Sequence, residues 1–354
     1  MQANPLGEFS FYLLAALSEL VHAGEVELRT QAHRLPNEPG HWIEIKDRET
    51  GSHTAVSIDT SDGPQLVALR RAAIADLVWK RSYQEDHLVG LSAEIFAKVK
   101  PFGLWYACRS GRETQQMLGR LAHLARGVAR LDKAGLVMIR NAFGLRQVFA
   151  GRASAANLPP LVADYEALPV PASPRVIFQT RVWDPSEGAD PDDRRKVNDM
   201  RASLVRSLRS ALGENFVGGL SPSVYAQNTY PDCLTRHAVD STSYRRLLLG
   251  CDIAINSTGL HGSNAFKIPE YFASSRVVVS ERLLCELPRP PIEGIDFLCF
   301  DSPGECVATC QRLLSDAEGR LSLMKAGRSY YDAFVQPAAS LRSRLDSLVL
   351  APES

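Results

Sequence analysis

The segment from Ser257 to Glu281, "STGLHGSNAFKIPEYFASSRVVVSE", gathers residues whose types and spacing suit an anion. Gly259, Gly262 and the small Ser263 allow backbone N–H groups to approach a bound group closely. A helix is expected to begin near Phe266, and its positive N-terminal end favours the same charge. Phosphate is the anion that such a loop suits.

Two charged residues follow this loop at helical spacing. Lys267 stands in the first turn of the expected helix and can place its ammonium on the same phosphate. Glu270 comes one turn later on the same face and can accept hydrogen bonds from a sugar diol. The alternative is an ordinary surface ion pair, which contributes only ~0.2–0.5 kcal/mol. The residues expected to bind the ligand here are Asn256, Ser257, Gly259, Gly262, Ser263, Asn264, Lys267 and Glu270.

The elements around this segment predict how it is positioned. The apolar run "CDIAIN" reads as a strand that delivers the loop, and "RVVVS" reads as the next strand. In an open α/β sheet, ligands bind outside the carboxyl ends of the strands, where loops lead into helices. The loop therefore occupies the place where such a sheet binds its ligand.

Composition limits the class of protein. A chain of 354 residues fits two domains of ~150 residues. Lys plus Arg equals Asp plus Glu at 40 each, so no overall charge favours nucleic acid or an anionic membrane as partner. The seven cysteines include no C-x-x-C pair, which fits reduced thiols in a cytoplasm. The N-terminal apolar run is too short to span a membrane and reads as an amphipathic or buried helix.

Along the chain, helix-period segments alternate with short β-branched runs, the pattern of α/β layers. A passage with five prolines, from Asn157 to Arg175, reads as a linker. We therefore expect two Rossmann-like domains facing each other across a cleft, spanning residues 1–165 and 166–354. In the first half the pattern predicts helices near 8–23, 64–74 and 112–132 and strands near 26–31, 42–46, 53–58 and 75–79.

The second half of the chain resembles the donor domain of GT-B glycosyltransferases, in particular the group 1 enzymes. The run "FKIPEYFASSRVVVSE" is similar to the segment K-x-x-E-Y-[LF]-A-x-x-x-x-V-V-S of that family, and "VIFQTR", "FVGGL" and "CDIAINST" precede it in the family's order. The resemblance covers Arg175 to the end. It implies sugar transfer from a nucleotide sugar, with Glu270 on the nucleotide ribose and both Lys267 and Arg181 on the diphosphate. Arg181 also fits a solvated residue at the rim of a strand.

The chain departs from the family at two positions of this motif. Many relatives carry an acidic residue eight positions before the glutamate, where this chain has Gly262, and Ala265 replaces the usual glycine nearer the lysine.

An inverting transfer also needs a group that removes the proton of the acceptor hydroxyl. Asp59 and Asp62 end the alternating run "HTAVSIDTSDGPQ" and are the candidates in the first half. Each fits equally well as the cap of an Asx turn before the helix near Pro64. His261 lies inside the phosphate loop, where it can donate to phosphate or to the leaving group, or stand as an exposed loop residue.

Other motifs favour structural roles. The Asp-x-Asp of "ADPDDRR" precedes a helix and does not end a strand, so Asp192 and Asp193 are expected to cap that helix and not to bind metal. The long helix after it presents several basic residues, including Arg201, that we place on a solvated face. Trp105 and Tyr106 suit stacking on a sugar, but an apolar run such as theirs is more typical of a core.

The sequence therefore predicts a cytoplasmic, hexosyltransferase-like enzyme that uses a nucleotide-diphosphate sugar as donor and needs no tightly bound cofactor or metal. Its expected partners are the nucleotide sugar and a glycan or lipid-linked acceptor of bacterial surface-glycan synthesis, with peripheral membrane association and without nucleic acid. Two alternatives stay open: a nucleotide-sugar epimerase of the same architecture, and a non-catalytic module that binds a nucleotide or glycan.

Overall fold

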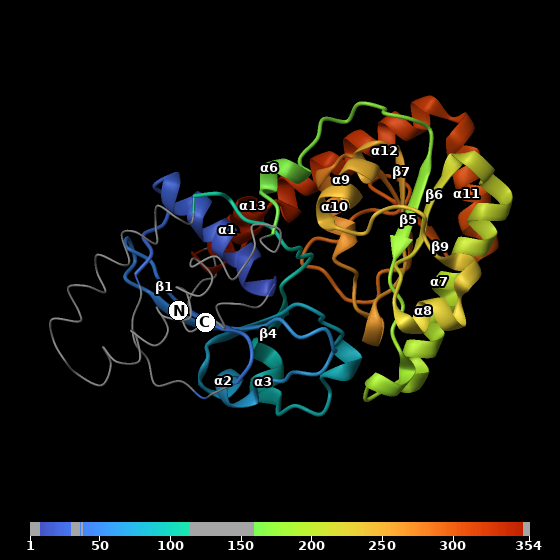
Figure 1. Cartoon of the computed structure of the whole chain (residues 1–354). Coiled ribbons are helices and arrows are strands. Elements are labelled where there is room, and N and C mark those ends of the chain that lie inside the picture. Colours follow the sequence, from blue (N-terminus) through green and yellow to red (C-terminus); the bar gives the residue numbers. More distant parts are fainter. Residues whose placement is uncertain (1–7, 30–35, 37, 113–158, 350–354) are drawn as a thin grey trace, which may run out of the picture.

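The computed structural model describes residues 8–29, 36, 38–112 and 159–349 of the chain. These residues form two α/β units, each built on a sheet with helices on both faces (Figure 1). The expected fold class, α/β with two sheet-centred units, is confirmed.

The first unit has a four-stranded sheet in the order β1-β2-β3-β4. β1 is antiparallel to β2, whereas β2, β3 and β4 are parallel. Side chains of α1 pack on one face of the sheet, and side chains of α2 and α3 pack on the other. The elements are α1 (Glu8–His22), β1 (His41–Lys46), β2 (His53–Asp59), α2 (Leu69–Ile74), β3 (Leu77–Lys80), α3 (Ala93–Lys98) and β4 (Val99–Pro101).

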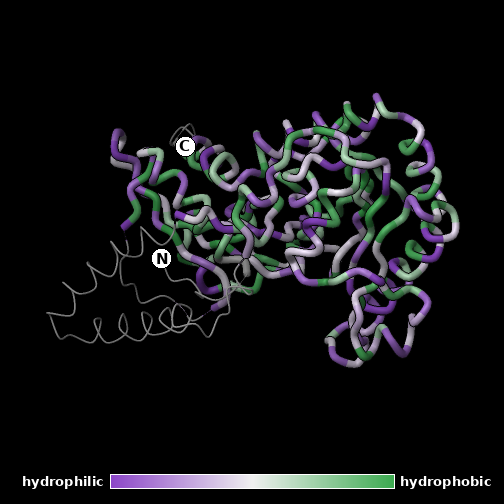
Figure 2. Tube along the Cα trace, turned by 45° about the horizontal axis from the view of Figure 1, so that its top comes forward, coloured by the Kyte–Doolittle hydropathy of each residue, from purple (hydrophilic) through white to green (hydrophobic). Residues whose placement is uncertain are grey.

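The second unit is a five-stranded parallel sheet in the order β6-β5-β7-β8-β9. Strands β5, β6 and β7 are buried along their whole length, as expected when helices cover both faces, and they form part of the hydrophobic interior seen in Figure 2. Helices α7 and α11 lie on one face and α9 and α10 on the other (Figure 1), while α12 contributes Leu323 and Met324 to the cluster of α7 and α11 and Tyr330 to that of α9 and α10. The elements are β5 (Val176–Thr180), α7 (Pro191–Leu212), β6 (Phe216–Leu220), α8 (Val224–Thr229), α9 (Ser241–Leu249), β7 (Ile253–Asn256), α10 (Lys267–Ala273), β8 (Val277–Glu281), β9 (Leu298–Phe300), α11 (Pro303–Ser315) and α12 (Ala317–Tyr330).

The order of the second sheet reverses between β5 and β7, because the chain passes from β5 outward to β6 and then returns to β7 on the other side of β5. Such a reversal is the point at which doubly wound sheets bind ligands. Here β5 and β7 pair only at Val176 with Ile253 and at Ile177 with Ala254, so the paired region stops short of their carboxyl ends.

The C-terminal end of the chain joins the two units. After α12, a π-helical turn (Tyr331–Val335) leads into α13 (Pro337–Val349), which packs against α1 of the first unit (Figure 1). The Tyr12 hydroxyl donates to the Val335 carbonyl over 2.7 Å, and the Tyr106 and Tyr331 hydroxyls lie 2.7 Å apart. One continuous apolar core therefore runs from α1 through the seam into the second unit.

Several boundaries differ from those that the sequence predicts. Residues 26–29, expected to open a strand, form no regular element, and the helix expected from residue 64 begins only at Leu69. The proline-rich passage contains a short helix, α6 (Val162–Tyr165). The helix expected near 112–132 lies outside the described residues, except for residue 112, which is not helical. In the described ranges, no helix has the length and apolar character needed to cross a membrane.

The close approach of β6 to β5 requires a glycine at position 218. This residue has φ +120°, and a Cβ atom added to it would lie 2.2 Å from the carbonyl oxygen of Phe178 on the neighbouring strand. We expect Gly218→Ala to lower the free energy of unfolding by at least about 2 kcal/mol in chemical denaturation. Gly304→Ala is the control, because its nearest atom lies 3.9 Å away. Equal denaturation midpoints for the two variants would contradict the tight approach.

Candidate functional site

Lys267 begins α10 and points into the space between the diverging ends of β5 and β7. Its Nζ atom donates to the carbonyl oxygen of Gln179, which lies beyond the part of β5 that pairs with β7. The same Nζ atom lies 4.1 Å from the ring centroid of Tyr244. Burial lowers the pKa of Lys267, although Glu270 opposes this shift. The ammonium is thus held at the switch point of the sheet.

Glu270 lies one turn further along α10 and is also half-buried. The hydroxyl of Tyr165, from the segment that links the two units, donates to its Oε1 atom over 3.4 Å. Burial raises the pKa of Glu270, and the charges of Lys267 and Arg245 act in the opposite direction. Since both members of the Lys267–Glu270 pair also contact groups outside α10, they are not the exposed surface pair considered as the alternative.

The loop between β7 and α10 is braced by its own backbone amides. Thr258 N donates to the Glu281 carboxylate over 2.9 Å, and Gly259 N donates to the Ser263 carbonyl over 2.9 Å. His261 N donates to the Asp193 carboxylate over 2.8 Å. These amides are therefore engaged within the protein, and side chains must supply a large part of any anion binding here.

The polar side chains of the loop also brace it. Asn256 donates from Nδ2 to Ser280 Oγ over 2.9 Å. Asn264 holds Cys285 at both backbone groups, donating to its carbonyl over 2.9 Å and accepting from its N–H over 3.2 Å. Gly262 adopts φ +70°, in the left-handed region that favours glycine. These contacts fix the shape of the loop that the sequence predicts to bind phosphate.

Arg201 of α7 is buried, and its placement on a solvated face was wrong. Its guanidinium donates to Ser257 Oγ over 2.9 Å, to the Arg181 carbonyl over 2.7 Å and to the Thr258 carbonyl over 3.0 Å. It also lies 4.5 Å from the ring of Trp183. Burial lowers the pKa of Arg201 to about 9. One side chain thereby connects the ends of β5 and β7. Its burial could have been predicted from helical spacing, since position 201 lies four residues from the buried Val197 and Val205.

Arg181 follows β5 directly, and its side chain is exposed. Its guanidinium carbon lies 5.8 Å from the Trp183 ring. Its positive charge helps to lower the pKa of both Lys267 and Arg201, whose pKa values burial lowers most, so the three cations lie near one another.

The first unit approaches the same loop through residues that follow β3. The guanidinium of Arg81 lies 4.1 Å from the Phe266 ring, next to Lys267. Gln84 donates from Nε2 to the His261 carbonyl over 3.5 Å, and Glu286 N donates to the Tyr83 carbonyl over 2.8 Å. The two units therefore meet at the loop.

Asp59 and Asp62, the two predicted bases of the first half, lie in different environments. Asp59 is fully buried; its carboxylate accepts from Ser61 N over 2.9 Å and from Val67 N over 2.8 Å, and lies 3.5 Å from Lys80 Nζ. These contacts favour the turn-capping role for Asp59. The side chain of Asp62 is 50% exposed and forms an ion pair with Arg81. Asp62 is thus the accessible carboxylate, and Arg81 links it to the loop.

His261 adopts φ 58° and ψ 27°, and its side chain is 43% exposed. Its Nδ1 atom lies 3.7 Å from the Asp193 carboxylate. The imidazole therefore stands at the surface of the loop, held beside the first turn of α7.

The remaining motifs take structural roles. The cap of α7 is Asp190, two residues before the expected Asp192, and its carboxylate accepts from Asp193 N over 2.9 Å. Trp105 and Tyr106 are buried in the core, as expected. Among the described residues, no group of His, Cys, Asp and Glu side chains is arranged to hold a metal ion. None of the seven cysteines, all of which lie in the described ranges, forms a disulfide bond.

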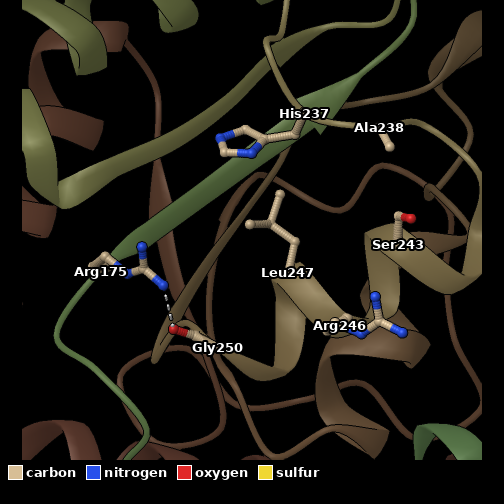
Figure 3. Close-up of a pocket in the computed structure, with 7 residues that line it drawn as sticks. All are labelled: Arg175, His237, Ala238, Ser243, Arg246, Leu247 and Gly250. Carbon is tan, nitrogen blue, oxygen red and sulfur yellow. Dashed lines mark hydrogen bonds between the residues drawn. The ribbon is translucent and has the colours of Figure 1, made fainter.

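A cavity of about 240 Å³ opens beside α9, at the amino end of β5 (Figure 3). Arg175 lies on one wall and donates to the Gly250 carbonyl over 3.2 Å, and His237 and Arg246 lie on others (Figure 3). None of the predicted site residues lines this cavity.

No protein-family model matches the sequence, and no curated protein matches it. Solved structures similar to the chain include the C-terminal domain of a group 1 glycosyl transferase from Francisella tularensis, with 10% identity, a TM-score of 0.36 and coverage of 49% of this chain and 97% of that domain. Anabaena HepE in complex with UDP has 11% identity and a TM-score of 0.41, with 82% of this chain and 72% of that chain covered. The UDP-GlcNAc 2-epimerase of Neisseria meningitidis bound to UDP-GlcNAc has 11% identity and a TM-score of 0.37, with 81% and 66% covered.

These likenesses are low in both identity and TM-score. They join glycosyltransferases and nucleotide-sugar epimerases in one group of similar structures, and they assign no activity, acceptor or site residue to this chain.

The burial of Glu270 predicts a pH-dependent stability. Because its pKa is higher in the folded protein than its usual value of 4.5, the folded state holds this proton more tightly. The stability due to protonation is therefore lost as the pH rises from about 4.5 through the folded pKa, at about 1.4 kcal/mol per pKa unit. Glu270→Gln stays neutral, so its free energy of unfolding relative to the wild type should increase from pH 4 to pH 8 in chemical denaturation.

Glu214→Gln, at an exposed position between α7 and β6, is the matched control and should show a constant difference from the wild type. Parallel stability profiles for wild type and Glu270→Gln would refute the raised pKa.

Proposed function

We propose that this protein is a cytoplasmic glycosyltransferase of the GT-B kind, which moves a sugar from a nucleotide-diphosphate sugar to the hydroxyl of a glycan or lipid-linked acceptor in surface-glycan synthesis. The supporting observation is the placement of Lys267 and Glu270 at the reversal point of the second sheet, within one set of cationic side chains. A diphosphate needs cations there, and a ribose diol needs an acceptor such as a carboxylate.

The cations at this point suit the leaving group of the reaction. When the bond between sugar and diphosphate breaks, negative charge develops on the diphosphate. Lys267 lies at the end of β5, where Arg181 projects exposed from the same strand end. Fixed positive groups stabilise such developing charge strongly in a partly buried site. In this proposal Lys267 and Arg181 take the role that a metal has in other transferases.

Glu270 takes the ribose of the donor in this proposal. Its Oε1 atom lies 3.4 Å from the Tyr165 hydroxyl, which lies 3.3 Å from the Ala107 carbonyl as well. Tyr165 belongs to α6, in the segment that links the two units, so donor binding and the seam between the units share one hydrogen bond.

Asp62 is the proposed base if the transfer inverts the anomeric configuration. It is the accessible carboxylate of the two predicted ones, and Arg81 connects it with the ring of Phe266 beside Lys267. A retaining transfer would need no such base. An epimerase would use the same donor residues, and it is distinguished by formation of a product isomer from the nucleotide sugar alone.

The donor site predicts how nucleotide affinity responds to substitution. Lys267→Ala and Glu270→Ala should each weaken binding of a nucleotide diphosphate by about 10-fold to 100-fold, since a hydrogen bond to a charged group is worth ~1.5–3 kcal/mol. Isothermal titration calorimetry against UDP, GDP, ADP and CDP measures these affinities and identifies the preferred nucleobase. Lys325→Ala, on the exposed side of α12, should leave affinity unchanged. Wild-type affinity in both site variants would exclude this donor site.

Turnover and stability, measured together, distinguish the proposed base Asp62 from the structural aspartate Asp59. Asp62→Asn keeps the shape of the residue but removes its capacity to accept a proton, so turnover should fall roughly 100-fold with donor affinity unchanged. Asp59→Asn should instead cost about 3 kcal/mol of stability, because it leaves the buried Lys80 ammonium without its counter-charge. If Asp62→Asn turns over normally, the base is His261 or the reaction is a retaining one.

A further inference from the structure

A second cavity of about 240 Å³ lies at the seam where the two units and the C-terminal helix meet. Leu104 contributes from the first unit, Leu287 and Pro288 from the segment after β8, Phe334 from the π-helical turn, and Arg344 from α13. The candidate donor site shares no residue with this cavity.

Arg344 brings a guanidinium to the wall of this cavity. Its Nη1 atom donates to the carbonyl and hydroxyl of Ser340, and its central carbon lies 4.4 Å from the Phe102 ring. Its Nε atom is buried and has no hydrogen-bond partner within the described part of the chain. No carboxylate of the described residues pairs with it, and burial lowers the pKa of Arg344 to about 10. A partly buried cation without an anion is costly, so an anionic ligand would be favourable at this point.

Part of the remaining wall is apolar. Leu104, Leu287 and Pro288 line it, and Phe334 stands at its rim with 40% of its surface exposed. A hydrogen bond of 2.7 Å from the Tyr330 hydroxyl to the Arg289 carbonyl anchors the Leu287–Arg289 wall to α12. The cavity thus offers cationic side chains and an apolar wall side by side.

A glycine keeps this cavity open. Gly103 adopts φ +106°, and a Cβ atom added to it would lie 3.0 Å from Arg344 Nη2 and 3.3 Å from Pro288 Cδ. A larger residue would press on the cation and on the apolar wall at once. The backbone of the first unit therefore approaches the Arg344 side chain as closely as the absence of a side chain allows.

We propose that the seam cavity binds an alkyl phosphate, with the phosphate on the guanidinium of Arg344 and the alkyl chain against Leu104, Leu287 and Phe334. The phosphate is contacted through Nη2, which lies beside Gly103 in the cavity wall and makes no hydrogen bond within the described residues, while the buried Nε atom keeps the local need for a negative charge high. Arg289, which also lines the cavity, adds a second positive charge suited to a doubly charged phosphate. The ligand would touch the first unit, the second unit and α13 together, and this inference does not rest on the proposed transfer reaction.

The test compares hexyl phosphate with its two halves, inorganic phosphate and hexanol, by calorimetry on the full chain. Hexyl phosphate should bind at least tenfold more tightly than either half, at concentrations below those at which it forms micelles. Arg344→Gln should weaken hexyl phosphate at least tenfold. Arg342→Gln is the matched control, because Arg342 lies on the same helix but its guanidinium pairs with Glu25.

A blocking variant keeps the test decisive if Arg344→Gln does not fold. Ser347 lines the cavity from an exposed position on α13, so Ser347→Trp should fill the cavity and abolish hexyl phosphate binding while leaving Arg344 in place. Equal affinity for phosphate and hexyl phosphate, binding only above the micelle concentration, or unchanged affinity in Ser347→Trp would each overturn the proposal. Nucleotide affinity measured on the same samples reports on the donor site separately, because Lys267 and Glu270 are unchanged.

Discussion

The short pairing between β5 and β7 is the constraint on which the candidate site depends. These strands pair with each other at only two positions. Beyond these positions, the backbone groups of β5 that face β7 need other hydrogen-bond partners. The carbonyl of Gln179 finds the ammonium of Lys267, and the side chain of Gln179 reaches the carbonyl of Ala238 over 3.2 Å. A fully paired ladder would satisfy the same groups with backbone amides and would leave no place for a lysine. The opening at the reversal point therefore creates both the space and the need for a cation.

Arg201 makes this opening stable. The ends of two diverging strands need an internal support, and a guanidinium with several N–H groups in one plane can serve several carbonyls at once. Its donations to the Arg181 and Thr258 carbonyls and to Ser257 place one rigid group between the two strand ends. The cost is a buried charge close to Lys267 and Arg181, which lowers the pKa of Arg201 and of Lys267. The clustered positive charge is thus a consequence of how the strands are supported, and it also suits an anionic ligand.

Local patterns in the sequence were enough to predict the strand, the turn and the helix that carry the candidate site residues, and long-range packing was not visible in them. The strand, the glycine-containing turn and the helix that carry Lys267 and Glu270 are all encoded within about twenty residues, so periodicity and spacing identify them. Tyr165, in contrast, lies 105 residues before the carboxylate that it contacts, and Gln84 lies 177 residues before His261. A single sequence does not show which distant segments meet. For Arg201, the rule that arginine is usually exposed outweighed a helical spacing that pointed inward.

The same reasoning explains why the first half of the chain was harder to interpret. An alternating strand that ends in aspartates fits both a site and a turn, and only the fold distinguishes them. Asp59 points into the unit, where Lys80 and the backbone of the following turn hold it, while Asp62 lies three residues later on the outside of that turn and reaches Arg81. The two ion pairs are made with neighbouring residues, Lys80, which ends β3, and Arg81, which follows it. The last residue of β3 thus carries one charge into the core, and the residue after it carries the next toward Phe266, where the first unit meets the loop of the second.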